Sequence, residues 1–243
     1  MRDWLPHRAR YLQILLELEA RPEGSSCWKC SKPNSLWRCA DCHGKPLFCN
    51  KCIKEAHDPN PFHRIEKWTG THFQPASLRD VGVTLCLGHG GQSCPQYLTT
   101  VPPLFTDDTT QASDEEEALD EEIEDQEVFS VESGGLDPKT FEIPRGTDPY
   151  GNTWITVVHT TGVHHLAVQY CQCPGRSDRH LQLLESGLYP ASVRKPKTVF
   201  TFQLLDDYYL ENLECKTPAR NYYAKIRRLT SNLFPHLIPV SSV

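Results

Sequence analysis

The chain has 243 residues, of which 38% are hydrophobic and 23% are charged, and its formal net charge is −6. The hydrophobic fraction is below that of a typical globular domain, so we expect part of the chain to lie outside any packed core. No apolar run is long enough to span a membrane, and the N-terminal residues alternate charge with leucine instead of forming a signal-peptide block. We therefore expect an intracellular protein with no membrane partner.

The net charge combines two regions of opposite sign. Between Asp107 and Asp137 there are 14 acidic residues and no lysine or arginine. The rest of the chain has 25 basic and 17 acidic residues, a balance of +8. We place the acidic run in a disordered insertion over 99–147, because its proline, serine, threonine and acidic residues bury too little apolar surface to offset the entropy of ordering.

The segment Leu5–Glu19 has helical spacing, and the sequence RPEGSS ends it. Its apolar side consists of Leu12, Leu15, Leu16 and Leu18. We predict an N-terminal helix within residues 1–22 that packs or docks through this side.

A run of cysteine and histidine follows, CWKCSKPNSLWRCADCHGKPLFCNKCIKEAHDPNPFH. It contains three C-x2-C pairs and one histidine pair, which are Cys27, Cys30, Cys39, Cys42, Cys49, Cys52, His57 and His63. In an intracellular chain such pairs favour metal binding over disulfides. Eight ligands suffice for two tetrahedral zinc ions, and the short segments between the pairs have too few apolar residues to fold without metal.

The spacing alone does not determine which pairs share an ion. The order of three cysteine pairs and a histidine pair resembles the cross-braced B-box finger, in which the first and third pairs hold one ion and the second and fourth hold the other. By that resemblance, residues 23–70 form a finger in which site 1 is Cys27, Cys30, Cys49 and Cys52, and site 2 is Cys39, Cys42, His57 and His63. A RING ubiquitin-ligase finger is expected to end in a cysteine pair, so the terminal histidines argue against ligase activity.

Further along, SLRDVGVTLCLGHGG predicts a short helix or turn, a strand and a glycine-rich loop, and NTWITVVHTTGVHHLAVQYCQC predicts a β-hairpin. On the second strand, Cys171 and Cys173 would share a face. Two thiolates do not complete a zinc site. We predict that His89 and Cys94, on the glycine-rich loop, complete a Cys3His site, with Cys86 as the alternative to His89.

The C-terminal part is predicted to be mainly helical. DRHLQLLESG reads as a short helix closed by Gly187, KTVFTFQLLDDYYLENLEC as a longer one, and TPARNYYAKIRRLTSN as a third that opens with Thr217 as N-cap and Pro218 at the first helical position. Asp206 and Asp207 are adjacent on the longer helix and do not share a face, so we do not expect a catalytic metal pair there. Residues 236–243 are predicted to be a tail.

The order of LWRCADCHGKPLFCNKC, LGHGGQSCP, TGVHHLAVQYCQC and NYYAKIRRLTSN resembles the CxC-type cysteine-cluster domain found N-terminal to fungal Kyakuja-Dileera-Zisupton (KDZ) transposases. The resemblance covers nearly the whole chain except the acidic segment. It implies a nuclear, zinc-chelating accessory domain that serves a DNA transposase, and it favours His89, Cys94, Cys171 and Cys173 as site 3.

Two departures from that pattern matter. The acidic insertion is longer than expected between the ligand pairs, and the chain ends before any region that could hold a transposase's catalytic carboxylates. We therefore expect the accessory portion alone, without enzyme activity. Its fold class is small α+β domains stabilised by three zinc ions, with a discontinuous cysteine-cluster module over 71–98 and 148–235.

Two functions remain open, and neither requires a small-molecule substrate. The first is assistance in DNA recognition, because basic residues supply phosphate contacts. The candidates are Arg176, Arg179, Arg194, Lys195, Lys197, Lys225, Arg227 and Arg228. The second is a B-box-type module that binds the transposase catalytic region or another protein. Basic residues clustered on one face would favour DNA, and an exposed apolar strip on the first helix would favour a protein partner. A zinc hydrolase would need an open coordination position, which four protein ligands exclude.

Overall fold

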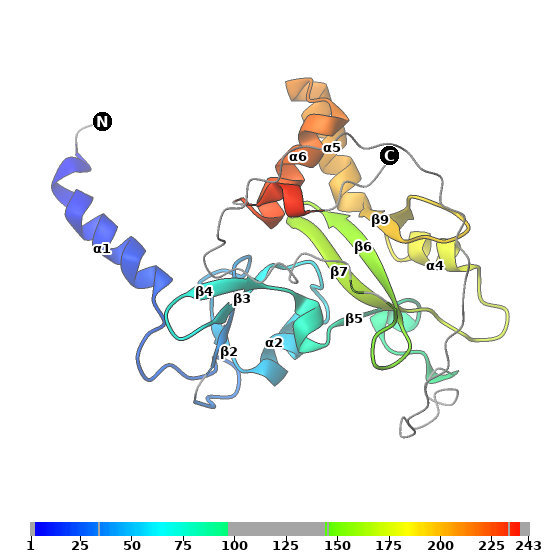
Figure 1. Cartoon of the computed structure of the whole chain (residues 1–243), viewed down its shortest axis with the longest axis horizontal. Coiled ribbons are helices and arrows are strands. Elements are labelled where there is room, and N and C mark those ends of the chain that lie inside the picture. Colours follow the sequence, from blue (N-terminus) through cyan, green and yellow to red (C-terminus); the bar gives the residue numbers. More distant parts are fainter. Residues whose placement is uncertain (1–2, 34, 97–143, 145, 233, 239–243) are drawn as a thin grey trace.

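The computed structural model describes residues 3–33, 35–96, 144, 146–232 and 234–238. These residues form a mixed α+β fold with two β-sheets (Figure 1). Almost all of the segment 99–147, for which we predicted disorder, lies outside the described residues, as does most of the tail at 236–243.

The first sheet contains the strands of the cysteine-rich finger and one strand just beyond residue 70, and it is antiparallel throughout, with the strand order β2-β1-β3-β4. Its strands are β1 (Trp37–Cys39), β2 (Leu47–Phe48), β3 (Ile65–Trp68) and β4 (Phe73–Ala76). Helix α2 (Asn50–His57) follows β2 and packs against β1 and β2. The connections from β1 to β2 and from β2 to β3 carry five of the metal-ligand candidates, which are Cys42, Cys49, Cys52, His57 and His63.

The second sheet is mixed and has the strand order β5-β7-β6-β9-β8. Its strands are β5 (Thr84–Cys86), β6 (Thr153–His159), β7 (Gly162–Gln169), β8 (Leu188–Pro190) and β9 (Thr198–Thr201). Strands β6 and β7 form the predicted hairpin, with Thr160 and Thr161 between them. Strand β5 pairs in parallel with β7, and β9 pairs in parallel with β6.

The predicted C-terminal helices are present, with two corrections. Helices α4 (Arg179–Glu185) and α6 (Ala219–Thr230) agree with the predicted segments, although Pro218 rather than Thr217 occupies the N-cap. The longer helix, α5, spans only Phe202–Cys215. The residues before it form β9, because their β-branched side chains suit a strand that pairs with β6. The Thr201 hydroxyl then caps α5 by accepting a hydrogen bond from the Leu204 N–H.

One hydrophobic core joins the finger to the second sheet. Ile53 on α2 and Ile65 on β3 belong to the same buried cluster as Leu85, Val157 and Leu166 on the second sheet. The 3-10 turn at Leu78–Val81 touches both α2 and β7. A second core lies under α5 and α6 and contains Val158, Val163, Leu204, Tyr222, Ile226 and Ile238.

Helix α1 (Arg8–Glu19) differs from the other elements, because it projects away from both sheets (Figure 1) and none of its residues is buried. It follows a 3-10 turn at Leu5–His7. The predicted helix therefore exists, but its apolar side does not pack against the described part of this chain. None of the helices in the described ranges is long and apolar enough to cross a membrane.

Candidate metal centres

The described residues contain three groups of four cysteine and histidine side chains, and within each group the ligand atoms lie within 4.8 Å of one another. The groups are Cys27, Cys30, Cys49 and Cys52 (site 1), Cys39, Cys42, His57 and His63 (site 2), and His89, Cys94, Cys171 and Cys173 (site 3). In the finger, the first and third pairs meet, as do the second and fourth. The pairing that the spacing left open is thus set by the fold.

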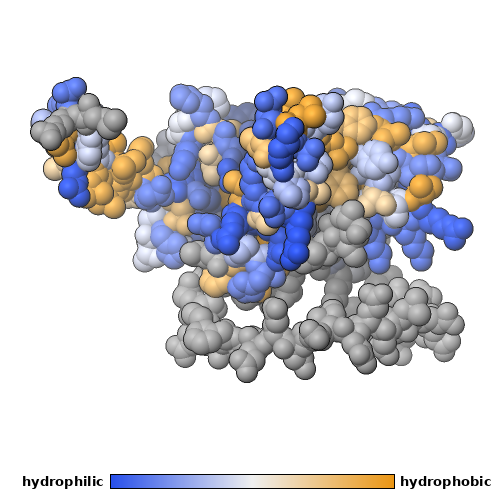
Figure 2. Space-filling model, turned by 90° about the horizontal axis from the view of Figure 1, so that it is seen from above, coloured by the Kyte–Doolittle hydropathy of each residue, from blue (hydrophilic) through white to orange (hydrophobic). Residues whose placement is uncertain are grey.

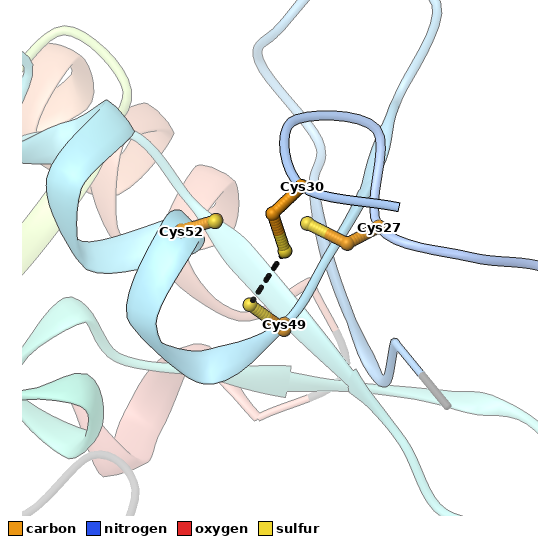
Figure 3. Close-up of side chains that lie close together, drawn as sticks. All are labelled: Cys27, Cys30, Cys49 and Cys52. Carbon is orange, nitrogen blue, oxygen red and sulfur yellow. Dashed lines mark hydrogen bonds between the residues drawn. The ribbon is translucent and has the colours of Figure 1, made fainter. Parts of the chain in front are cut away.

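Site 1 is built from a tight loop and the start of α2. Cys27 and Cys30 lie on the loop, which the Ser31 N–H closes by donating to the Cys27 carbonyl at 2.8 Å. Cys49 is the N-cap of α2 and Cys52 is in its first turn. Figure 3 shows the four thiols pointing toward one another, with the Cys30 and Cys49 sulfurs 3.7 Å apart.

Site 2 lies between β1, α2 and the loop that leads to β3. Cys39 ends β1, and Cys42 follows in the next turn. The His63 Nδ1 lies 3.5 Å from the Cys39 sulfur and 3.6 Å from the Cys42 sulfur. The His57 Nε2 lies 3.6 Å from the Cys42 sulfur, and its Nδ1 is 2.8 Å from the Ile53 carbonyl. Since Nδ1–H donates to that carbonyl, the Nε2 lone pair is free for a metal ion.

An ion pair supports the turn that carries Cys42. The Asp41 carboxylate accepts hydrogen bonds from the Arg64 backbone N–H at 2.6 Å and from its guanidinium at 2.5 Å. Burial raises the pKa of Asp41, but the hydrogen bonds from Arg64 lower it by more, so the carboxyl stays ionised. Arg64 directly follows His63, so this pair fastens both halves of site 2 together.

Site 3 owes its position to the parallel pairing of β5 with β7, in which Thr84 lies opposite Ala167 and Cys86 opposite Gln169. Paired parallel strands end at the same edge of a sheet. The chain therefore leaves both strands at one edge, and the loops that follow contain the pair His89 and Cys94 and the pair Cys171 and Cys173. This pairing brings together ligands that the acidic segment separates in sequence.

The ligands of site 3 converge through loops. Cys171 and Cys173 lie beyond the end of β7, so the expectation that they share a strand face is wrong. The His89 Nε2 lies 3.3 Å from the Cys171 sulfur and 3.5 Å from the Cys173 sulfur. Gly88, at φ 85°, lets the loop approach closely, because a Cβ there would lie 3.3 Å from the Cys171 Cβ.

Cys86 is not part of site 3. Its sulfur lies 3.7 Å from the Ser93 hydroxyl and 3.6 Å from the Gln169 Oε1, and the fourth member of the cluster is His89. Burial raises the pKa of the Cys86 thiol. The thiol thus remains protonated and donates to the glutamine.

The ligand spacing in the three sites matches a tetrahedral metal ion. With Zn–S near 2.3 Å and Zn–N near 2.0 Å, a tetrahedron has S···S edges of about 3.8 Å and S···N edges of about 3.5 Å. The Cys94 sulfur lies 3.9 Å from that of Cys171 and 3.7 Å from that of Cys173. A disulfide would need about 2.05 Å. The described cysteines are all free thiols.

In several of these thiols, burial and neighbouring thiols disfavour the charged thiolate form, which a bound cation would favour. Burial raises the pKa of Cys27, but backbone N–H groups, with that of Cys49 foremost, lower it by more, to about 6. Burial and neighbouring thiols raise the pKa of Cys52 to about 12, and burial foremost raises that of Cys39 to about 12. A hydrogen bond with Cys171 is the largest cause that raises the pKa of Cys173 to about 11. A divalent ion would stabilise the thiolates together.

Two glutamines that the sequence analysis did not consider hold the site 3 loops. The Gln169 Oε1 accepts a hydrogen bond from the Cys94 N–H at 3.2 Å. Gln182, on α4, accepts from the Cys171 N–H at 2.8 Å and donates to the Cys171 carbonyl at 3.1 Å. Gln182 is only 3% exposed. A glutamine among the leucines of LQLLE was the available signal in the sequence.

The basic candidates come from three segments, 176–179, 194–197 and 225–228, and several have intramolecular partners. Arg176 pairs with Glu185 at 2.6 Å, and Lys225 pairs with Glu211 at 2.8 Å. Other partners are the Tyr170 ring for Arg179 and the Pro235 carbonyl for Arg227. Arg194, Lys195 and Lys197 are exposed on the β8–β9 connection, and Arg228 is exposed on α6. Figure 1 shows α4 and α6 well apart on the second sheet.

The adjacent carboxylates on α5 have no shared site. Asp207 accepts a hydrogen bond from the Tyr222 hydroxyl at 2.5 Å and so joins α5 to α6, while Asp206 is exposed. Burial and the contact with Asp207 raise the pKa of Tyr222. Asp207 thus has a structural role.

These features define a class, a cysteine- and histidine-rich module whose clusters can each hold a metal ion through four protein side chains. Residues 145–233 match the family model described as CxC2 like cysteine cluster associated with KDZ transposases. The family resemblance is thereby confirmed for this segment, which contains Cys171 and Cys173 but none of the finger. The description names a cysteine cluster and not a catalytic domain. No curated protein and no solved structure matches the chain.

Proposed function

We propose that this protein is a zinc-binding, non-catalytic accessory module of a KDZ-type transposase. The observation that carries the proposal is the set of three four-ligand clusters at tetrahedral spacing. Thiolate and imidazole ligands suit Zn²⁺, and four protein ligands leave no position for a catalytic water. Each ion would thus stabilise the fold. Elemental analysis of the reduced, folded protein tests this, with three zinc ions per chain expected and two or fewer contradicting it.

The cross-braced arrangement of sites 1 and 2 supports a B-box-like finger over residues 23–70. In such a finger each ion holds two segments that are separated in the chain, so neither site can form without bringing the other's ligands close. The two sites alternate along the chain. Cys39 of site 2 precedes β2 in the sequence, and Cys49 of site 1 follows it. Loss of either ion should consequently unfold both sites.

We propose that the module assists DNA recognition in the nucleus through phosphate contacts from the β8–β9 connection and α6. The support is the balance of +8 outside the acidic segment and the exposure of Arg194, Lys195 and Arg228. Phosphate contacts of this kind are independent of sequence and weaken as salt rises.

A mobility-shift titration of duplex DNA at two salt concentrations tests the DNA role. The triple variant Arg194→Ala, Lys195→Ala and Arg228→Ala should weaken binding. It should also reduce the slope of log K against log salt concentration by the equivalent of up to about three phosphate contacts. A control for the loss of one exposed positive charge elsewhere is Lys51→Ala on α2, whose side chain is 83% exposed and lies on the finger. Equal affinities of all three proteins would contradict the DNA role.

A second candidate, a protein-interaction module, is favoured by the exposed apolar side of α1. Its partner would be the transposase catalytic region or another protein. Leu15 and Leu16 are 61% and 64% exposed, and isolated apolar strips of this kind mark interaction sites. The two functions are compatible, because α1 and the basic segments lie on different parts of the molecule (Figure 1).

A further inference from the structure

Helix α1 has an apolar side that stays exposed in the described part of the chain, apart from the His7 ring, which stacks on Tyr11 with 5.9 Å between the ring centroids. We define the α1 apolar face as Tyr11, Leu12, Leu15, Leu16 and Leu18, whose side chains are all at least 53% exposed. Figure 2 shows hydrophobic surface on the arm that projects from the body of the molecule. A helix of 12 residues is marginal by itself in water, so most of its stability must come from a packed partner.

The opposite side of α1 needs no partner. Gln13 donates a hydrogen bond to Glu17 at 2.8 Å, and Arg10 lies 3.9 Å from the same carboxylate. At about 100° per residue these three side chains cluster together, and the apolar face occupies the other side of the helix. The helix is therefore amphipathic, with one side suited to solvent and the other suited to a packed partner.

The far end of the helix is fixed to the finger. Arg38, which is 4% exposed, donates to the Leu18 carbonyl at 3.0 Å and to the Glu19 carboxylate at 2.8 Å. These contacts hold the last turn of α1 against the first sheet, so the helix projects at a set angle. Its apolar face remains open along its whole length.

Two charges mark the ends of the apolar face. Arg8 lies in the first turn and Glu19 is the last residue, and at about 100° per residue both fall near the centre line of the face. A parallel copy of the helix would set Arg8 against Arg8 and Glu19 against Glu19. An antiparallel copy sets each Arg8 against a Glu19, and it places Leu12 opposite Leu15.

We propose that two copies of this chain associate through an antiparallel, two-fold pairing of their α1 apolar faces. The face is complementary to itself only in that orientation, which is the condition for an isologous dimer contact. Glu19 can accept hydrogen bonds from Arg38 of its own chain and from Arg8 of the second copy, because its side chain is 64% exposed and a carboxylate accepts several hydrogen bonds. The pairing goes beyond the proposed zinc-binding and DNA-binding roles and does not depend on either. It uses the face that the second candidate function assigns to a different protein, and is an alternative to that function.

The contact is small. Stable interfaces bury about 800 Å² on each partner, and a single helix of this length covers less. We accordingly expect a micromolar dimer that forms readily when the transposase or DNA brings two copies together.

The test is sedimentation velocity of the full, zinc-loaded chain over a range of concentrations. Wild type should form dimers in the micromolar range, and the variant Leu12→Glu with Leu15→Glu should weaken dimerisation by at least about tenfold. The matched control, Arg10→Gln with Gln13→Glu, changes the net charge equally on the opposite side and should dimerise like wild type. Helix content and zinc stoichiometry show that each variant is folded.

A second variant tests the orientation. Arg8→Glu would place Glu against Glu19 in the antiparallel pair and should weaken it several-fold, more so at low salt, whereas a parallel pair would exchange one like-charge contact for another. The proposal is overturned if the wild-type protein is still a monomer at about 100 μM. A dimer that the double leucine variant leaves intact also overturns it, since the contact would then lie elsewhere, such as on α5.

Discussion

The side chain of Gln182 forms two hydrogen bonds with the backbone of Cys171: it accepts from the Cys171 N–H at 2.8 Å and donates to the Cys171 carbonyl at 3.1 Å. This glutamine is buried on α4 and is not a ligand, so it acts on site 3 by positioning a ligand-bearing loop. Metal sites commonly depend on such outer partners for affinity.

Gln182→Leu should weaken metal binding at site 3 by about 10- to 100-fold while sites 1 and 2 keep their ions. The leucine fills the space but leaves the N–H and carbonyl of Cys171 unpaired. Competition with a zinc chelator measures this, with Gln203→Leu on the exposed side of α5 as control. If the two variants release zinc at the same chelator concentration, Gln182 has no positioning role.

Cys171→Ser should reduce the zinc content from three ions per chain to two. Serine cannot supply the thiolate, and His89, Cys94 and Cys173 would be left as an incomplete site. The finger should stay folded, because its eight ligands are intact. Cys215→Ser is the matched control, since Cys215 is exposed and belongs to none of the three clusters. Loss of more than one ion would mean that the continuous core couples site 3 to the finger.

Gly162→Ala should destabilise the docking of α6 on the hairpin. Gly162 has φ 147°, and a Cβ there would lie 2.8 Å from the Thr230 hydroxyl oxygen, which itself accepts from the Val163 N–H. Overpacking of this kind costs about 1–3 kcal/mol of unfolding free energy. Gly187→Ala is the control, because Gly187 also has positive φ, 76°, but open space around it. Equal losses of stability in urea titrations would show that only backbone strain matters.

Acid should destabilise the contact between the finger and the hairpin. Burial lowers the pKa of His164 to about 3 and that of His159 to about 4, from 6.5, and the His159 ring lies 5.0 Å from that of Phe62. Below pH 6.5 the unfolded chain takes up protons that the folded chain does not. The contribution of these two histidines to stability is therefore complete above pH 6.5 and is lost as the pH drops toward 4.

The measurement is the free energy of unfolding between pH 7.5 and pH 5, with zinc content followed in parallel because acid also releases metal. His164→Gln should show a shallower decline than wild type. His72→Gln, at an exposed histidine, should decline like wild type. A His164→Gln profile parallel to the wild-type profile would assign the acid sensitivity to the metal sites alone.

Removing the acidic segment 107–137, which lies outside the described residues, should strengthen DNA binding. The deletion removes 14 negative charges and changes the net charge from −6 to +8, so attraction to phosphates increases and its salt dependence steepens. A neutral glycine–serine linker of equal length in its place controls for chain length, and it should bind as tightly as the deletion. Equal affinity of all three chains would leave the segment a spacer, and loss of zinc would make it part of the fold.

Local chemistry predicted much of this molecule from the sequence. The C-x2-C pairs and the histidine pair identify their own side chains as candidate ligands, because such short spacing lets two donors reach one ion in almost any compact fold. The hairpin strands on either side of Thr160 and Thr161 followed from β-branched residues and a turn, and α4 followed from helical spacing and Gly187. These features depend on neighbours in the chain, which the sequence displays directly.

The tertiary structure decided what depends on contacts between distant segments. Whether His89 or Cys86 joins site 3 was open until the parallel pairing of β5 with β7 set where each loop emerges. Strand β7 ends before Cys171 and Cys173, and Gln182 holds the backbone of Cys171 there. Pairing with β6 turned the first residues of the predicted long helix into β9.

The first helix shows the same division. Its periodicity fixed that it forms and which side is apolar, since both follow from spacing within 15 residues. Only the folded chain shows that this side stays open, because Arg38 fixes the end of α1 to the finger and directs the helix away from both cores. A helical pattern specifies a surface to be covered, while the packing of all other elements determines whether the same chain covers it.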